Sequence, residues 1–388
     1  MTMHMLKLTL ASLHARCKYC TSYIFPLLIL GMMACSSSPA GADEPILPDT
    51  DDTTDNQQPS NDSHTAPSAL PGQPVGFATL TAAPTGGEGG AQVTVTTAAE
   101  LTAALKRSEP LIIYVKGELS FTNVLSVKAV NKTLLGLTGS KLVSQQRDAS
   151  TSGILYFKEG STNLILRNLT FESAGAYDCD GRDNLCIDGT TRIWVDHCDF
   201  QDGVDGNFDC KNASDLITIS YCRFRYLKAP LAGGPGGSDD HRFCNLWGSS
   251  DSNTQDRGHL RTTFVGCWWD EGCRDRMPRV RFGQVHIVEC LYSSSATSVC
   301  VGLGYEANVC VERTVFRNIS KSIYKQHVKD DANHQGLIEL RDCLFPGSTT
   351  ATSNGTSFTP PYTLSTPTAA SEVEAKVRAE AGATLSIK

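Results

Sequence analysis

Three aspartates and one arginine have the types and spacing of residues that could act together on one ligand. Asp183, Asp205 and Asp209 follow one another closely, and Arg276 comes later in the chain. Neighbouring carboxylates raise each other's pKa values unless a cation lies between them. Oxygen-only ligands from Asp select a hard cation, and an irregular loop-edge geometry suits Ca²⁺ better than Mg²⁺. The set predicts a calcium site beside a guanidinium, whereas any one aspartate alone would indicate a solvated turn.

The elements that must position these residues are short strand-like runs that end in an aromatic residue. The seven aromatic residues are Phe171, Phe200, Phe224, Trp269, Tyr292, Phe316 and Phe345. Five of the six spacings are 23 to 29 residues, and five of the seven runs have a cysteine two residues before the aromatic. Such a period, with β-branched residues and short polar turns, is typical of a solenoid. It favours an all-β parallel β-helix whose coils stack about 4.8 Å apart.

In a β-helix, residues at equal offsets from the repeated aromatic lie on one line along the solenoid. The offsets before the next aromatic are 17 for Asp183, 19 for Asp205, 15 for Asp209 and 16 for Arg276. We therefore expect the four side chains to share one strip of surface. The one irregular spacing, of 45 residues, holds an extra coil or a long loop, and the Gly-rich segment 232–250 is expected to project from one face.

The chain has 15 cysteines, and those at the repeated slot are expected to be buried free thiols that fill the core. Cys179 and Cys186, seven residues apart in a loop, are the pair we expect to form a disulfide. The mature chain has no CxxC pair, which argues against a zinc site.

The N-terminal part of the chain predicts export. Residues 1–35 combine Lys7, Arg16 and Lys18 with a short apolar run and are interpreted as a signal peptide, with Cys35 in a lipobox-like context as the lipidated residue. Residues 36–75 are polar and are expected to form a disordered tether. The alternative is an ordinary cleaved signal with an incidental cysteine. We expect an outer-membrane or cell-surface lipoprotein, or otherwise a secreted protein, that contacts membranes only through this anchor.

The charge distribution excludes a general nucleic-acid partner. The formal net charge is −7, but nine acidic residues and no Lys or Arg lie between residues 36 and 105. Residues 106–388 carry 31 basic and 32 acidic residues and are nearly neutral. We expect residues 76–388 to form one catalytic domain, with a helical capping segment near 371–383, that works as a monomer.

Three motifs make the chain resemble pectate lyases of polysaccharide lyase family 1. They are WVDH at residues 194–197, DGNFD at 205–209 and RMPRVRFG at 276–283. The resemblance runs from about Gly76 to the C-terminus. It implies a right-handed parallel β-helix that cleaves polygalacturonate, the backbone of pectin, by β-elimination with Ca²⁺ as cofactor.

The resemblance also implies roles for single residues. Asp183, Asp205 and Asp209 match calcium ligands, and Arg276 matches the catalytic base. Two further residues, Lys228 and Arg281, match substrate-binding positions, and Asp180 is a further ligand candidate. The insertion after Leu231 lengthens the interval between Lys228 and Arg276.

Three other functions were weighed. A pectin lyase acting on methyl-esterified polymer would not need the calcium aspartates. A glycoside hydrolase would need an acid–base carboxylate pair where this strip carries an arginine. A surface protein that only binds polysaccharide would have no reason to keep Arg276, Arg281 and Lys228 together. His197 is interpreted as the hydrogen-bonded structural partner of Asp196 rather than as a general base.

Overall fold

The computed structural model describes residues 72–388. The predicted signal peptide, Cys35 and all but the last four residues of the predicted tether lie outside this part of the chain. Within it, no helix has the length and apolar character needed to cross a lipid bilayer.

The described chain forms three parallel sheets. Sheet 1 has ten strands: β1 (Ala91–Val95), β2 (Leu111–Val115), β5 (Val130–Gly136), β8 (Thr162–Arg167), β11 (Thr191–Asp196), β14 (Asp215–Ser220), β17 (Thr262–Val265), β20 (Gln284–Val288), β23 (Asn308–Glu312) and β26 (Leu337–Arg341). Sheet 2 has eight: β3 (Glu118–Phe121), β6 (Lys141–Ser144), β9 (Thr170–Glu172), β12 (Asp199–Gln201), β15 (Arg223–Arg225), β18 (Trp268–Trp269), β21 (Leu291–Tyr292) and β24 (Val315–Phe316). Sheet 3 also has eight: β4 (Leu125–Val127), β7 (Leu155–Phe157), β10 (Leu185–Asp188), β13 (Phe208–Lys211), β16 (Leu246–Trp247), β19 (Arg279–Val280), β22 (Val299–Leu303) and β25 (Ser322–Gln326).

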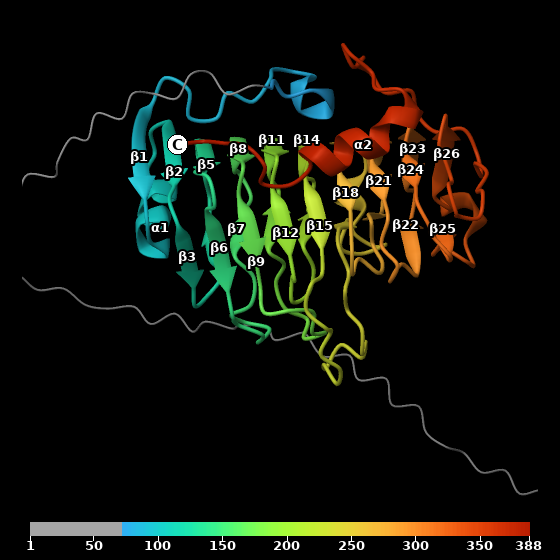
Figure 1. The fold of residues 1–388 in the computed structure, drawn as a ribbon, viewed down its shortest axis with the longest axis horizontal. Helices are drawn as coiled ribbons and strands as arrows, with labels where there is room; N and C mark the ends of the chain where they lie inside the picture. The colour runs from blue at the N-terminus through green and yellow to red at the C-terminus, as the bar shows by residue number, and fades with distance from the viewer. Residues whose placement is uncertain (1–71) are drawn as a thin grey trace, which may run out of the picture. The chain divides into compact units, whose positions relative to one another are not determined.

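The chain visits sheets 1, 2 and 3 in turn and then pairs with the strand one coil earlier, so that successive coils stack along the solenoid (Figure 1). This is the right-handed parallel β-helix that the repeat and the resemblance predicted. The hand is the one that parallel crossover connections adopt almost without exception.

The seven repeated aromatic residues form one continuous stack inside the solenoid. Phe200 lies between Phe171 and Phe224, with ring centroids 4.7 and 5.2 Å away. The stack continues through Trp269, Tyr292, Phe316 and Phe345, at centroid distances between 4.4 and 5.7 Å. The expected core ladder is therefore confirmed.

The described cysteines are all free thiols. The expected free cysteine ladder is confirmed: the backbone N–H of Cys198 donates to the sulfur of Cys222, and that of Cys267 to the sulfur of Cys290. The expected disulfide between Cys179 and Cys186 is wrong. Cys186 occupies a strand position in β10, whereas Cys179 packs in the preceding loop against Ala174 and Val204.

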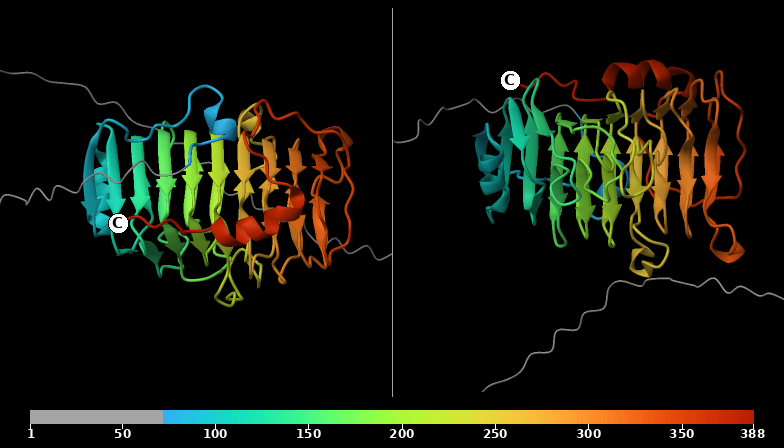
Figure 2. Two further views of the ribbon diagram at one scale, coloured as in Figure 1. Left: turned by 45° about the horizontal axis from the view of Figure 1, so that its top comes forward. Right: turned by 90° about the horizontal axis from the view of Figure 1, so that it is seen from below.

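Two helices cover the solenoid. Helix α1 (Ala98–Lys106) buries Leu101 and Leu105 in the main core beside the first coil, and Thr97 and Glu100 form its capping box. Helix α2 (Ala370–Glu380) falls in the segment predicted to be helical, and it packs Val373 and Val377 onto the outer side of sheet 2. The chain beyond α2 runs back along the solenoid toward the N-terminal coils (Figure 2). Short 3₁₀ helices lie at Gly76–Thr79, Thr254–Asp256 and Ala332–His334.

The irregular 45-residue interval is a single coil with two long turns and no extra coil. Strands β15, β16 and β17 occupy sheets 2, 3 and 1, in the same order as the strands of the coils before and after them. The turns between them span residues 226–245 and 248–261. The first turn extends from the lower edge of the solenoid in the left view of Figure 2.

Candidate active site

A cavity of about 110 Å³ lies on the outer face of sheet 3, and all three predicted aspartate ligands line it. The register pairs Cys186 of β10 with Asp209 of β13. Because side chains alternate along a strand, Asp209 points outward while Phe208 and Cys210 point into the core. Asp183 precedes β10, and Asp205 precedes β13 by three residues. The stacking of adjacent coils thus brings the three carboxylates to one site.

Asp183 is buried, and its surroundings oppose its ionisation. Burial is the main cause that raises its pKa well above the usual value, followed by the charges of Asp209 and Asp205. The neighbouring Gly206 must lack a side chain, because a Cβ there would lie 2.4 Å from an Asp183 carboxylate oxygen. The glycine of the DGNFD motif therefore leaves room for that oxygen.

Asp209 lines the same cavity. Its Oδ1 accepts a hydrogen bond from the backbone N–H of Leu246 at 2.9 Å. Burial raises its pKa to about 6, although the charge of Arg276 acts in the opposite direction. Two carboxyl groups that resist ionisation in one cavity form a donor set that a cation would stabilise.

Asp205 also belongs to a second group that includes a histidine from the long turn. The imidazole of His241 lies 3.4 Å from Asp205 through Nε2 and 3.3 Å from Asp178 through Nδ1. His241 is buried, and within residues 72–388 neither of its ring nitrogens has a hydrogen-bond partner of good geometry. Ligand atoms of all three residues lie within 4.8 Å of one another.

The long turn is fixed against Asp178. The backbone N–H of Ser238 donates to Asp178 Oδ2 at 2.7 Å, and Gly234 and Gly236 approach so closely that a Cβ at either position would meet Asp178 at 2.0 to 2.2 Å. Asp178, and not the exposed Asp180, is therefore the aspartate of this segment that lies in the group with His241 and Asp205. The Gly-rich sequence of the turn allows this close packing.

Arg276 lies in the turn before β19 and acts electrostatically on the cavity. Its guanidinium carbon lies 4.6 Å from the centre of the Phe243 ring. Phe243, like His241, belongs to the long turn between β15 and β16. The positive charge of Arg276 lowers the pKa values of both Asp209 and Asp183. The arginine and the two aspartates thus form one electrostatic group, in agreement with their common offsets.

The two predicted substrate-binding residues have other partners in this structure. Lys228 Nζ donates to the Ser173 carbonyl at 2.6 Å and lies 3.3 Å from Glu172. Arg281 donates to Asp251 at 2.5 Å and to the Gly248 carbonyl at 2.7 Å. Neither residue lines the aspartate cavity.

Two cationic residues of this face were missed. Lys211 lines the cavity. Electrostatic interactions with Cys186 and Tyr156, and then with Asp183 and Asp209, raise its pKa, although burial acts in the opposite direction. Lys211 stands two residues after Asp209 on the same face of β13, so strand alternation could have identified it. Arg279 lies one pair beyond Leu246 in the row of Asp209. Burial first, and then the charges of Arg281 and Arg276, lower its pKa to about 10.

His197 lies outside the cavity, as predicted. Its Nδ1 lies 2.8 Å from Asp196 Oδ2, which also accepts a hydrogen bond from Arg167 at 2.7 Å. This group belongs to sheet 1, and the structural role expected for it stays a prediction.

The donor set of the cavity fits calcium. The three predicted ligands offer only carboxylate oxygens, and burial makes two of them costly to ionise without a counter-charge. Hard divalent cations prefer such oxygen donors. The neighbouring cations Arg276 and Lys211 would oppose binding, but three carboxylates still outnumber them.

The sequence matches a family model described as pectate lyase over residues 62–385. A probable pectate lyase B of Aspergillus terreus is 32% identical over 292 residues, which cover 73% of this chain and 80% of that protein. A pectate trisaccharide-lyase of Thermotoga maritima is 32% identical over 240 residues, 58% of each protein.

Solved structures share the fold. A Bacillus subtilis pectate lyase mutant matches with a TM-score of 0.64 and 22% identity, covering 81% of this chain and 97% of that chain. A pectate lyase bound to a hexasaccharide matches with a TM-score of 0.63 and 23% identity, covering 79% and 96%.

Proposed function

The chain belongs to the pectate lyase family, and on that premise we propose how its own residues carry out the reaction. It is a polysaccharide lyase that cleaves α-1,4-linked polygalacturonate by β-elimination. The C5 proton leaves, its bonding electrons form the C4–C5 double bond, and the C4–O bond breaks. The products are a 4,5-unsaturated uronide and a shortened chain, and no water is consumed.

Asp183, Asp205 and Asp209 are the proposed calcium ligands. The observation that supports this assignment is their common cavity beside Arg276. The bound ion would neutralise the substrate carboxylate next to C5 and so make the C5 proton more acidic. The fold contributes by placing the three carboxylates in one cavity and by placing positively charged side chains on the same outer face of sheet 3.

Arg276 is the proposed base that accepts the C5 proton. Arginine normally stays protonated, so its neutral form must be favoured by neighbouring positive charge. Arg279 and Arg281 are the nearby positive residues: burial first, and then the charges of Arg281 and Arg276, lower the pKa of Arg279. The Phe243 ring holds the Arg276 guanidinium in place.

Lys228 and Arg281 are the proposed substrate-binding residues. Each has a protein carboxylate or carbonyl as its present partner, and a polyanionic substrate offers carboxylates that can replace those partners. Binding would therefore free Asp251 and Glu172 from their cations.

The proposal is tested by mixing the purified protein with polygalacturonate and following the ultraviolet absorbance of the unsaturated product. We expect activity with added Ca²⁺, loss of activity in chelator, and loss in Asp209→Asn. Saturated products only would indicate a hydrolase, and full activity in chelator would contradict the calcium site.

We also propose that the protein is exported, anchored through a lipid on Cys35, and active as a monomer. Metabolic labelling with palmitate should mark the wild type and not Cys35→Ser. Size-exclusion chromatography with light scattering would test the monomer, and an unlabelled wild type would favour simple secretion.

A further inference from the structure

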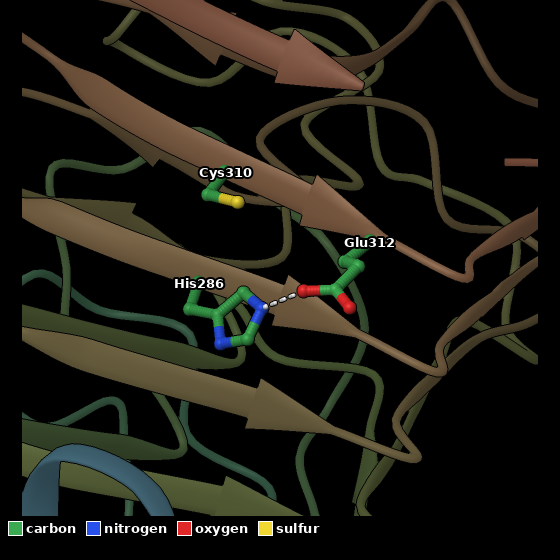
Figure 3. Close-up of side chains that lie close together, drawn as sticks. All are labelled: His286, Cys310 and Glu312. Carbon is green, nitrogen blue, oxygen red and sulfur yellow. Dashed lines mark ion pairs between the residues drawn. The ribbon is translucent and has the colours of Figure 1, made fainter. Parts of the chain in front are cut away.

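A separate group of metal-ligand side chains lies on sheet 1, away from the candidate active site on sheet 3 and from the group of His241, Asp178 and Asp205. His286 of β20 and Cys310 of β23 are register partners, and Glu312 follows Cys310 by two residues. All three point outward, because Val285, Ile287, Val309 and Val311 of the same strands point into the core. Figure 3 shows the three side chains directed toward one another.

The geometry of this group fits a small cation. The ligand atoms of the three residues all lie within 4.8 Å of one another, and His286 Nε2 lies 3.3 Å from Glu312 Oε2. Zinc bonds of about 2.0 Å to nitrogen or oxygen and about 2.3 Å to sulfur would place tetrahedral ligand atoms about 3.3–3.5 Å apart. Small side-chain rotations would therefore be enough to close the site.

His286 is prepared to act as a ligand. It is 3% exposed, and within the described residues its Nε2 has no hydrogen-bond partner of good geometry. Its Nδ1 lies 2.9 Å from the hydroxyl of Tyr362, which in turn contacts the hydroxyl of Thr263. A metal-binding histidine usually has its second nitrogen fixed in this way, which orients the ring.

Cys310 differs from the cysteines of the core ladder. Those stand two residues before the stacked aromatic, and in this coil Thr314 holds that position. Cys310 is fully buried but lies on the opposite face of the strand, beside polar groups. A thiol on the outer face of a sheet next to a histidine and a carboxylate is not explained by core packing.

We propose that His286, Cys310 and Glu312 bind one zinc ion that stabilises the C-terminal coils. A mixed nitrogen, sulfur and oxygen donor set suits Zn²⁺ and does not suit Ca²⁺. Arg313 pairs with the second oxygen of Glu312 and holds the carboxylate in place. A cavity of about 340 Å³ borders His286 and Glu312, so water can supply the fourth ligand. Through Tyr362 the ion would also hold the segment before α2 against sheet 1.

This site does not have the short cysteine spacing of a CxxC motif. Its ligands come from two strands paired one coil apart, 24 residues from each other along the chain for His286 and Cys310. Sheet pairing, and not a local motif, brings them together.

The test uses the reduced full chain, stripped with chelator and then titrated with ZnSO₄ alone, and separately with CoCl₂. We expect one tightly held zinc per chain by elemental mass spectrometry and a thiolate-to-cobalt charge-transfer band in the near ultraviolet. Cys310→Ser should lose the band and the tight zinc, and His286→Gln should weaken zinc binding at least tenfold. Cys343→Ser, which changes a half-buried ladder thiol, is the matched control and should keep both.

Calcium-dependent lyase activity of each variant reports that it has folded. A wild type without the charge-transfer band, or a Cys310→Ser protein that retains it, would overturn the proposal. Zinc bound without the band would place the ion at His241 and the neighbouring aspartates instead, which would equally overturn it.

Discussion

The guanidinium of Arg276 lies over the ring of Phe243, which comes from the long turn between β15 and β16. Contacts of this kind contribute about 0.5–2 kcal/mol. If the ring positions the proposed base, Phe243→Leu should lower kcat about 3- to 30-fold with little change in Tm. Phe243→Tyr keeps the aromatic face and should retain most activity. Steady-state rates on polygalacturonate, with Tm recorded for each variant, make the comparison. Equal kcat values for the Leu variant and the wild type would show that the Phe243 ring does not position Arg276 for the reaction.

Replacement of the proposed base itself should have a larger effect. Arg276→Lys keeps the charge but shortens the reach and changes the geometry of the donor, so we expect a loss of at least 100-fold in kcat. Arg274→Lys is the control: Arg274 lies on the same turn as Arg276, between β18 and β19, but pairs with Asp240 of the turn between β15 and β16. If the neutral form of Arg276 is the base, kcat should rise between about pH 7 and 10, because more of the arginine is then deprotonated. A flat profile over that range would argue against Arg276.

The stability of the calcium-free protein should depend on Asp209 in a defined direction. Its folded pKa of about 6 is above the unfolded value near 3.8, so the folded state binds the proton more tightly. That contribution to stability is fully present below the unfolded pKa and is lost as the pH rises through about 6. In chelator we therefore expect Asp209→Asn to have a higher Tm than the wild type at pH 8, and the difference to shrink toward pH 4.

The same variant should also lose the response to calcium. Added Ca²⁺ should raise the Tm of the wild type at pH 8 and leave Asp209→Asn nearly unchanged. Asp180→Asn, at an exposed position outside the cavity, should behave as the wild type in both series. A wild-type Tm that ignores calcium would count against the assigned ligands.

Lys211 offers a test that separates ion binding from turnover. Its charge attracts Asp183 and Asp209 and opposes a cation in the same cavity. Lys211→Met should therefore increase calcium affinity severalfold. This corresponds to a gain of about 1 kcal/mol in binding free energy, at the effective dielectric constant that applies near a protein surface. Isothermal titration calorimetry would measure the affinity. A weaker calcium affinity in this variant would show that Lys211 supports the site structurally.

The aromatic stack should be the main determinant of stability. Phe224→Ala removes a ring between Phe200 and Trp269 and should cost about 3–5 kcal/mol of unfolding free energy. Phe358→Ala, at a half-buried ring on the C-terminal segment, is the control and should cost clearly less. Urea denaturation followed by far-ultraviolet circular dichroism measures both. Similar costs would mean that the stack adds nothing beyond ordinary burial.

The repeat predicted the fold because its period fixes which residues lie above one another. The spacing from Phe200 to Phe224 and from Trp269 to Tyr292 was enough to predict the stacked rings. The offset of Asp183 from the repeat placed it correctly beside Asp209 for the same reason. The prediction failed where the chain leaves the repeat. His241 reaches Asp178 and Asp205 only because a 20-residue turn folds back, and no periodicity encodes that contact.

Other misses had different causes. Cys179 and Cys186 are close in sequence, but proximity along the chain does not decide a disulfide when one of them occupies a strand. His286 and Cys310 stand at equivalent positions of two coils, which the period does place together, but a search for short cysteine motifs overlooks pairs joined by stacking.

The turn between β15 and β16 changes neither the register of β15 with β18 nor that of β16 with β19. Insertions at this point can therefore change the surface beside the aspartate cavity while the strand pairing of the solenoid stays the same. A change in the length of this turn should therefore not destabilise the stacked coils. We expect that exchange of residues 226–245 between relatives would alter which uronide polymers are accepted, while the thermal stability of the recipient changes little.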